Sequence, residues 1–134
     1  MPRFQYACPL RWADQDAYQH VNNVQTLRLL EEARVALFFQ AARTDGIATW
    51  EGELVVVRHE IDYRRPLLYR PEPVTIELWI DQIRSSSFRV GYVVRDETAT
   101  YAEAVSVLAA YDKTAGRARR LTAEERAWLE KYTD

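Results

Sequence analysis

Reactive and hydrogen-bonding side chains gather in one short stretch, residues 11–23 (RWADQDAYQHVNN). The stretch holds two carboxylates, one imidazole and two neighbouring amides, which belong to Asp14, Asp16, His20, Asn22 and Asn23. A carboxylate can deprotonate a water molecule or attack a carbonyl carbon itself. An imidazole beside it could act as an acid or a base, or could hold a leaving group. We interpret this stretch as the candidate active site.

The stretch leads into a helical pattern, and the start of a helix adds a second chemical element. The first turn of a helix has backbone N–H groups without intrahelical partners, and the macrodipole adds positive character there. A carbonyl group docked on these N–H groups is polarised, and the oxyanion formed on attack is stabilised. With no serine or cysteine triad evident in the sequence, the combination suits transfer of an acyl group from a good leaving group to water.

Each polar residue also has a simpler structural interpretation. Aspartate is common in turns, so Asp16 could only cap a turn, but its place in the full motif favours the catalytic role. We expect Asp14 to brace the loop or to orient Arg11. For His20 two roles are equally favoured, namely to order the loop or to assist the reaction at the carbonyl group. We do not expect a metal site, because no third nitrogen or sulfur ligand accompanies these residues at a suitable spacing.

The elements that position the stretch follow from hydrophobic periodicity. Residues 3–12 alternate as a half-buried strand, with Phe4, Tyr6, Cys8, Leu10 and Trp12 on the apolar face. Residues 13–22 are polar and predict a loop. Residues 23–43 contain neither Gly nor Pro and repeat apolar residues at steps of three and four, widened by Val24, Phe38 and Ala42. This pattern predicts a long helix with a broad apolar face.

The ends of this helix and the elements after it are also predicted. Asn22 or Asn23 would cap its start, and Gly46 its end. The apolar run Leu54–Val57 is expected to be buried, and alternation predicts strands over 57–63, 74–80, 88–94 and 102–110. A capping box at Thr122–Glu125 starts a short terminal helix.

This order of elements predicts an α+β fold in which a curved antiparallel sheet wraps around one long central helix. Such a sheet has open edges, and pairing with a second copy would bury them, so we expect a homodimer. At 134 residues, residues 1–134 are expected to form a single domain.

Composition narrows the function classes. The net charge is −2, with both signs interspersed and no basic run, so nucleic acid is not expected as a partner. Cys8 is the single cysteine, which excludes an intrachain disulfide. We expect it to be a small buried hydrophobic residue. No apolar signal segment or membrane-length run is evident, so no membrane partner and a cytoplasmic location are expected.

Three stretches carry a resemblance to a known family. Residues 11–23, followed by Leu27 and Glu31–Arg34, resemble the opening of the 4-hydroxybenzoyl-CoA thioesterase-like family of hotdog-fold acyl-CoA thioesterases. Residues 57–67 (VRHEIDYRRPL) resemble the family's strand after the helix, and residues 83–88 its next strand junction. The resemblance implies a hotdog fold, dimers with a continuous sheet, often tetramers, and active sites at the dimer interface. For this chemistry we expect no metal and no redox cofactor.

The resemblance also implies roles for single residues. Asp16 occupies the position of the family's catalytic carboxylate, as nucleophile or general base, and the backbone N–H of Asn23 that of the oxyanion donor. Arg84, Ser86 and Ser87 fall where family members contact CoA. Serines replace basic residues that are common at that junction, and a tyrosine usual soon after the paired asparagines is missing.

Other candidates have plain interpretations. His59, on the apolar face of its strand, is expected to be a core or interface histidine. Glu31 is expected on the helix surface, from which it could reach the site of a neighbouring subunit. Arg64 and Arg65 are expected to be solvated or ion-paired, with a phosphate contact as a minor alternative.

We therefore expect an acyl-CoA thioesterase in which Asp16, His20 and Asn23 form the catalytic set. One alternative is an enzyme that acts on acyl groups attached to acyl carrier protein. Another is a non-catalytic acyl-CoA-binding protein, although retention of the whole motif argues against it. A hotdog dehydratase is disfavoured, because the Asp-to-His spacing and following glycine of that group are not seen.

Overall fold

The computed structural model describes residues 3–47, 50 and 53–134. Its helical elements are η1 (Trp12–Asp14, a 3-10 turn), α1 (Asn23–Val35), η2 (Ala36–Ala41, a π-helical segment), α2 (Ala42–Thr44) and α3 (Ala123–Glu130). Its strands are β1 (Phe4–Cys8), β2 (Glu53–Tyr63), β3 (Val74–Asp81), β4 (Ser87–Arg95), β5 (Thr100–Asp112) and β6 (Arg117–Ala118). The order of elements is the predicted one.

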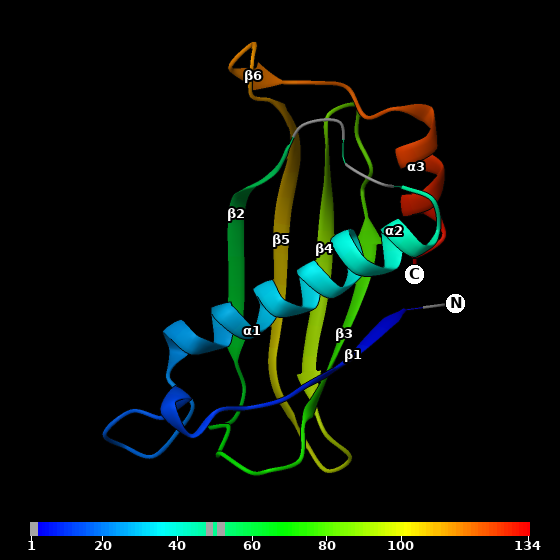
Figure 1. Cartoon of the computed structure of the whole chain (residues 1–134). Coiled ribbons are helices and arrows are strands. Elements are labelled where there is room, and N and C mark those ends of the chain that lie inside the picture. Colours follow the sequence, from blue (N-terminus) through cyan, green and yellow to red (C-terminus); the bar gives the residue numbers. More distant parts are fainter. Residues whose placement is uncertain (1–2, 48–49, 51–52) are drawn as a thin grey trace.

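The strands form one antiparallel sheet in the order β1-β3-β4-β5-β2, and β6 pairs with β5. In Figure 1, α1, η2 and α2 form one continuous rod that crosses one face of the curled sheet. This is the hotdog architecture, and the prediction of a curved antiparallel sheet around one long helix is confirmed. The first residues of α1 lie toward the end of the sheet that carries the β4–β5 turn, where the candidate site is found (Figure 1).

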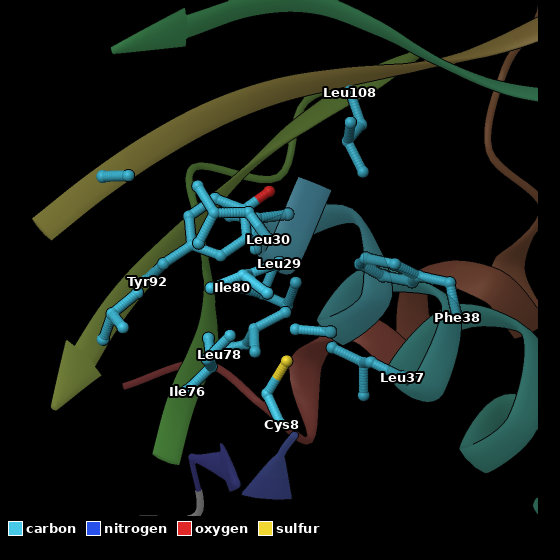
Figure 2. Close-up of a cluster of buried hydrophobic side chains, with 14 of the residues drawn as sticks. Cys8, Leu29, Leu30, Leu37, Phe38, Ile76, Leu78, Ile80, Tyr92 and Leu108 are labelled. Atoms are coloured by element: carbon cyan, nitrogen blue, oxygen red, sulfur yellow. The ribbon is translucent and has the colours of Figure 1, made fainter. Parts of the chain in front are cut away.

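Strand alternation places every second side chain of the central strands under the helix. On β5, residues Ala102, Ala104, Ser106, Leu108 and Ala110 are all buried, as the alternation predicted. They pack with alternate residues of β3 and β4 and with Leu29, Leu30 and Leu37 of the helical rod (Figure 2). Burying each large aliphatic side chain contributes about 1.5–3 kcal/mol relative to leaving it exposed. The helix is thus fixed on the sheet by its own apolar face.

The helix begins and ends where the sequence predicted. Asn22 is the N-cap, and its side chain accepts a hydrogen bond from the backbone N–H of Val24. Gly46 has φ +96°, the left-handed conformation that glycine adopts without a steric penalty. The prediction that Val24 widens the apolar stripe was wrong, because this side chain is exposed. At about 100° per residue, Val24 lies about 120° around the helix from Leu30 and so faces away from the sheet.

Two further predictions of burial were wrong. Trp12 is 74% exposed, because β1 ends at Cys8 and the chain then turns into η1. The run Leu54–Val57 is only partly covered, and its Val57 is 62% exposed. It lies on β2, an edge strand bonded only to β5, where the register shifts between Val56 and Arg58. Cys8 is buried, as predicted.

The terminal helix α3 closes the opposite end of the core. Thr122 caps it in the predicted capping box, in which the Thr122 hydroxyl accepts from the Glu125 N–H and the Glu125 carboxylate accepts from the Thr122 N–H. Trp128 then packs edge-on against Phe38 and Trp50. Within the described residues, no helix has both the length and the apolarity needed to cross a bilayer.

Candidate active site

A pocket of about 400 Å³ opens beside the first turn of α1. Its lining combines polar and apolar side chains from the loop before α1, from α1 itself and from the sheet: Asp16, His20, Val21, Asn23, Thr26, Tyr63, Arg64, Arg65, Pro66, Leu67, Val94, Tyr101 and Ala102. The structure therefore brings Asp16, His20 and Asn23 together on one pocket, and the apolar residues among the others provide a floor for a non-polar group.

A tight turn places Asp16 and His20 at the pocket. The Asp16 N–H donates to the His20 carbonyl over 3.0 Å, and the Gln19 N–H donates to the Asp16 carbonyl over 2.9 Å. Gln19 has φ +65°, a left-handed conformation that closes the turn. The Val21 N–H then donates to the Leu67 carbonyl over 2.7 Å, which ties the turn to the segment after β2.

The carboxylate of Asp16 accepts two hydrogen bonds. Its Oδ1 accepts from the backbone N–H of Tyr18 over 2.9 Å, and its Oδ2 accepts from Asn22 Nδ2 over 3.1 Å. These donors, the Tyr18 N–H first and the Asn22 amide second, lower the pKa of Asp16 below its ordinary value. The carboxylate is therefore ionised at neutral pH, the form that a nucleophile or a general base requires.

The start of α1 presents an open backbone donor. The N–H of Val24 is occupied by the Asn22 side chain, and the N–H of Thr26 donates to the Asn22 carbonyl over 3.0 Å. Among the described residues, the N–H of Asn23 has no hydrogen-bond acceptor. The Tyr63 hydroxyl donates to the Asn23 carbonyl over 3.1 Å and holds this residue against β2.

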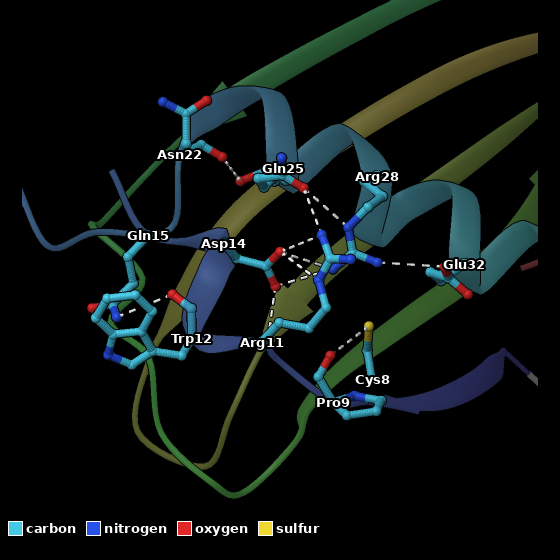
Figure 3. Close-up of polar contacts among 11 residues, drawn as sticks. Cys8, Pro9, Arg11, Trp12, Asp14, Gln15, Asn22, Gln25, Arg28 and Glu32 are labelled. Atoms are coloured by element: carbon cyan, nitrogen blue, oxygen red, sulfur yellow. Dashed lines mark hydrogen bonds and ion pairs between the residues drawn. The ribbon is translucent and has the colours of Figure 1, made fainter. Parts of the chain in front are cut away.

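Asp14 is the buried brace of the loop, as predicted (Figure 3). Its carboxylate, 0% exposed, accepts from the backbone N–H and Nε of Arg11 and from Nη2 of Arg28, over 2.8 to 3.1 Å. Burial alone would raise the pKa of Asp14, but the hydrogen bonds from Arg11 and the charge of Arg28 lower it. The Asp14 carbonyl accepts from the Asn22 N–H over 2.9 Å, so this buried ion cluster also fixes the helix cap.

The facing wall of the pocket holds residues that sequence reasoning did not assign to a site. The Tyr101 hydroxyl donates to the Asp96 carboxylate, which also accepts from Arg70 over 3.0 Å. The hydrogen bond with Asp96, with burial next, raises the pKa of Tyr101, so its hydroxyl stays protonated at neutral pH. Arg64 is ion-paired with Glu103 over 2.9 Å, as expected. Arg70 and Arg64 lie far from their acidic partners in the sequence, so no local spacing signals these two contacts. Tyr101 and Asp96 face each other across the short β4–β5 turn.

Arg84, Ser86 and Ser87 do not line this pocket. They lie at the β3–β4 turn, at the opposite end of the sheet (Figure 1). Ser87 pairs with Ala109 on β5, whereas the pocket residue Ala102 is seven residues away on the same strand. At about 3.3 Å per residue, this separation is roughly 23 Å. Within one chain, the predicted catalytic and CoA-contacting residues are therefore not brought together.

The second histidine, His59, also lies away from the pocket. It is exposed on the edge strand β2, so it is not a core residue, and its Nδ1 lies 2.6 Å from the Ser106 hydroxyl oxygen. Glu31 is exposed on α1, as expected. Within residues 3–47, 50 and 53–134, no three side chains of His, Cys, Asp or Glu are grouped closely enough to hold a metal ion.

Comparison with known proteins identifies the family. A family model described as the thioesterase-like superfamily matches residues 10–129. The chain belongs to the thioesterase-like superfamily. This membership makes it a thioester hydrolase, and it confirms the family resemblance carried by the stretch before α1.

Individual relatives agree with this assignment. The long-chain acyl-CoA thioesterase FadM of Escherichia coli (strain K12) is 31% identical over 117 residues, which cover 86% of this chain and 88% of FadM. A thioesterase from Thermus thermophilus, solved in complex with coenzyme A and Zn, is 28% identical with a TM-score of 0.80, covering 96% of this chain and 92% of that one.

A more distant relative supports the fold alone. A predicted thioesterase from Bacillus stearothermophilus is 21% identical and superposes with a TM-score of 0.87, over 99% of this thioesterase and 98% of the other chain. The sheet wrapped around one helix is therefore shared over the whole chain.

Proposed function

We propose that this thioesterase hydrolyses acyl-CoA thioesters to a free carboxylic acid and CoA, at the pocket beside α1. The observation that carries the proposal is the meeting of an ionised carboxylate, Asp16, and an open backbone donor, the Asn23 N–H, at one pocket. FadM is described as a long-chain acyl-CoA thioesterase, and the Thermus protein is complexed with coenzyme A, which supports CoA as the carrier.

In this mechanism the thioester carbonyl oxygen accepts from the Asn23 N–H, which polarises the carbonyl and stabilises the oxyanion. One such donor typically contributes about 2.7–4 kcal/mol to lowering the barrier. The apolar part of the pocket, formed by Val21, Leu67, Val94 and Ala102, takes the start of the acyl group.

Two routes use Asp16. As a nucleophile, its carboxylate oxygen forms a bond to the carbonyl carbon, the C–S bond breaks with release of the CoA thiolate, and water cleaves the mixed anhydride. As a general base, it takes a proton from water, whose oxygen attacks the carbonyl carbon directly, and the C–S bond then breaks with release of the CoA thiolate. In both routes His20, on the same pocket, is placed to hold or protonate the departing thiolate.

We further propose that the working form is a homo-oligomer paired along β2. This strand is an open edge that exposes Val56 and Val57, and a second copy paired there would cover both the apolar side chains and the unpaired backbone. The proposed CoA contacts of Arg84, Ser86 and Ser87 then require a second chain, because one chain holds them far from its own pocket. A cytoplasmic location stays a prediction.

The test is an Asp16→Asn variant assayed on short, long and aromatic acyl-CoAs. Asparagine keeps the shape and the acceptor for the Tyr18 N–H, so we expect an intact fold and a loss in kcat/KM of at least about 100-fold. Glu130→Gln, an exposed carboxylate change on α3, is the matched control. Hydrolysis at the parent rate would overturn the role of Asp16.

A parallel assay with the same acyl groups on acyl carrier protein tests the carrier. Turnover of the CoA esters is expected. Turnover of the protein-bound thioesters alone, or tight CoA-ester binding without any turnover, would overturn the proposed function.

A further inference from the structure

We infer that Asn22 is a positioning residue whose one side chain holds the Asp16 carboxylate in place relative to the open N–H of Asn23. The inference deepens the proposed function and rests on it, because it concerns the two groups that would attack and polarise the thioester. Asn22 itself does not line the pocket, so it acts through its neighbours and not on the substrate.

The geometry of the Asn22 amide carries the inference. Its Oδ1 accepts from the Val24 N–H over 2.9 Å, and its Nδ2 donates to Asp16 Oδ2 over 3.1 Å. The assignment of oxygen and nitrogen is fixed by these partners, because a backbone N–H can only donate and a carboxylate can only accept. One rigid planar group therefore spans the gap between the carboxylate and the helix.

The same amide also fixes the helix start on which the open donor lies. By accepting from Val24, it satisfies the second N–H of α1, while the first, that of the pocket residue Asn23, has no acceptor among the described residues. The Asn22 backbone is fixed from the other side, since its N–H donates to the Asp14 carbonyl over 2.9 Å. Asn22 therefore holds both the Asp16 carboxylate, which would attack, and the helix start that presents the Asn23 N–H.

Helix capping alone does not call for asparagine here. Ser, Asp and Asn cap helices about equally well, because each offers an oxygen to the first turn. Of these three residues, only asparagine carries the acceptor and the donor on two separate atoms, so that Oδ1 reaches the Val24 N–H while Nδ2 reaches Asp16. This donor orients the Asp16 carboxylate. The other titratable or charged groups on the pocket are His20, Tyr63, Arg64, Arg65 and Tyr101.

Two substitutions at position 22 separate capping from positioning. Asn22→Ser keeps a cap acceptor but has a single oxygen for both roles, so it loses the separate amide donor to Asp16. Asn22→Asp keeps a strong cap and replaces the donor with a second negative charge, which raises the pKa of a neighbouring carboxylate. Thr122→Ala is the matched control, because it removes a cap hydrogen bond of the same kind at α3, away from the pocket.

For Asn22→Asp we expect the acidic limb of the kcat/KM profile to move up by at least about one pH unit. We also expect kcat at neutral pH to fall about tenfold, because the Asp16 carboxylate loses the donor that orients it. KM is expected to stay within about twofold, because the pocket lining is unchanged. Asn22→Ser should move the limb in the same direction by less. Thr122→Ala should lower only the thermal unfolding midpoint. A pH profile that is unchanged in both Asn22 variants would overturn the inference.

A measurement without turnover makes this failure distinguishable from failure of the proposed function. The pKa of Asp16 can be followed by NMR titration of its carboxyl carbon in the parent and in each Asn22 variant. We expect the pKa to rise in Asn22→Ser and to rise further in Asn22→Asp. Equal pKa values in parent and variants would overturn the positioning role, whether or not the protein hydrolyses acyl-CoA.

Discussion

Helices α1 and α3 both start with a side-chain cap, but the two caps contact different kinds of partner. At α3, the Glu125 carboxylate is buried, accepts from the Thr122 N–H and pairs with Arg119 over 2.9 Å, so all cap groups bind within the fold, and we call this start closed. At α1, the cap satisfies the Val24 N–H, and its spare donor points to Asp16. The closed start serves the fold alone, whereas the start of α1, which we call open, places its first N–H on the pocket.

The largest effect on stability is expected at the closed start. Glu125→Gln would leave the guanidinium of Arg119 largely buried without its charge partner, so we expect the free energy of unfolding to fall by about 3 kcal/mol. Denaturant titration measures this loss, and kcat/KM at a permissive temperature should stay near the parent value. The matched control is Glu124→Gln, an exposed residue of the same first turn. If both variants lose equal stability, the ion pair between Glu125 and Arg119 does not stabilise the start of α3.

A smaller loss is expected at the brace beneath the open start. Asp14→Asn keeps the shape of the side chain but leaves Arg11 and Arg28 without their shared carboxylate, so we expect a loss of about 2 kcal/mol. Unlike the Glu125 variant, it should also lower kcat/KM, because Asp14 fixes the Asn22 backbone. Unchanged activity in a destabilised Asp14→Asn variant would show that the open start does not depend on its brace.

The pH dependence of stability gives a further distinction. The pKa of Asp14 is lowered in the folded state. The ionised Asp14 carboxylate therefore contributes fully to the free energy of unfolding above the unfolded carboxyl pKa of about 3.9. This contribution is lost as the pH falls through the lower folded value. Denaturant midpoints measured from pH 7 to pH 3 should fall more steeply in the parent than in Asp14→Asn. If the midpoints of the parent and of Asp14→Asn fall in parallel, the ionised Asp14 carboxylate does not stabilise the fold.

A modest effect is expected from Tyr63→Phe. The change removes the hydrogen bond to the Asn23 carbonyl, which is partly exposed, so we expect a loss of about 1 kcal/mol or less. The loss in kcat/KM, expressed as a free energy, should exceed the loss in the free energy of unfolding. The reason is that this hydrogen bond holds Asn23, whose N–H is the proposed oxyanion donor. Thermal unfolding and steady-state kinetics on one preparation measure both. An unchanged kcat/KM would mean that Asn23 is held without Tyr63.

The smallest effect is expected from Thr122→Asn, which gives the closed start the cap residue of the open one. Asparagine and threonine both accept from the first turn, so the stability change should stay within about 0.5 kcal/mol. Thermal unfolding checks this value. A loss of stability well above this value would show that asparagine and threonine are not interchangeable as caps at α3.

How far the sequence predicted this molecule follows from the range of the interactions. Periodicity and caps act over a few residues, so the helix from Asn23 and its Asn22 cap could be predicted. Trp12 and Val57 were misjudged because their exposure depends on where a strand ends and which strand forms the edge. Arg28 was missed as the second partner of Asp14, because this contact depends on tertiary packing.

The π-helical segment η2 affects how this chain is aligned with its relatives. The Ala42 N–H donates to the Leu37 carbonyl, five residues back, so this turn holds one residue more than an α-helical turn. The helix absorbs the extra residue without breaking. An alignment that runs through Ala36–Ala41 without a gap against an uninterrupted α-helix would shift every later helical residue by one position. That shift corresponds to about 100° around the axis, enough to assign a buried residue such as Ala42 to the wrong face.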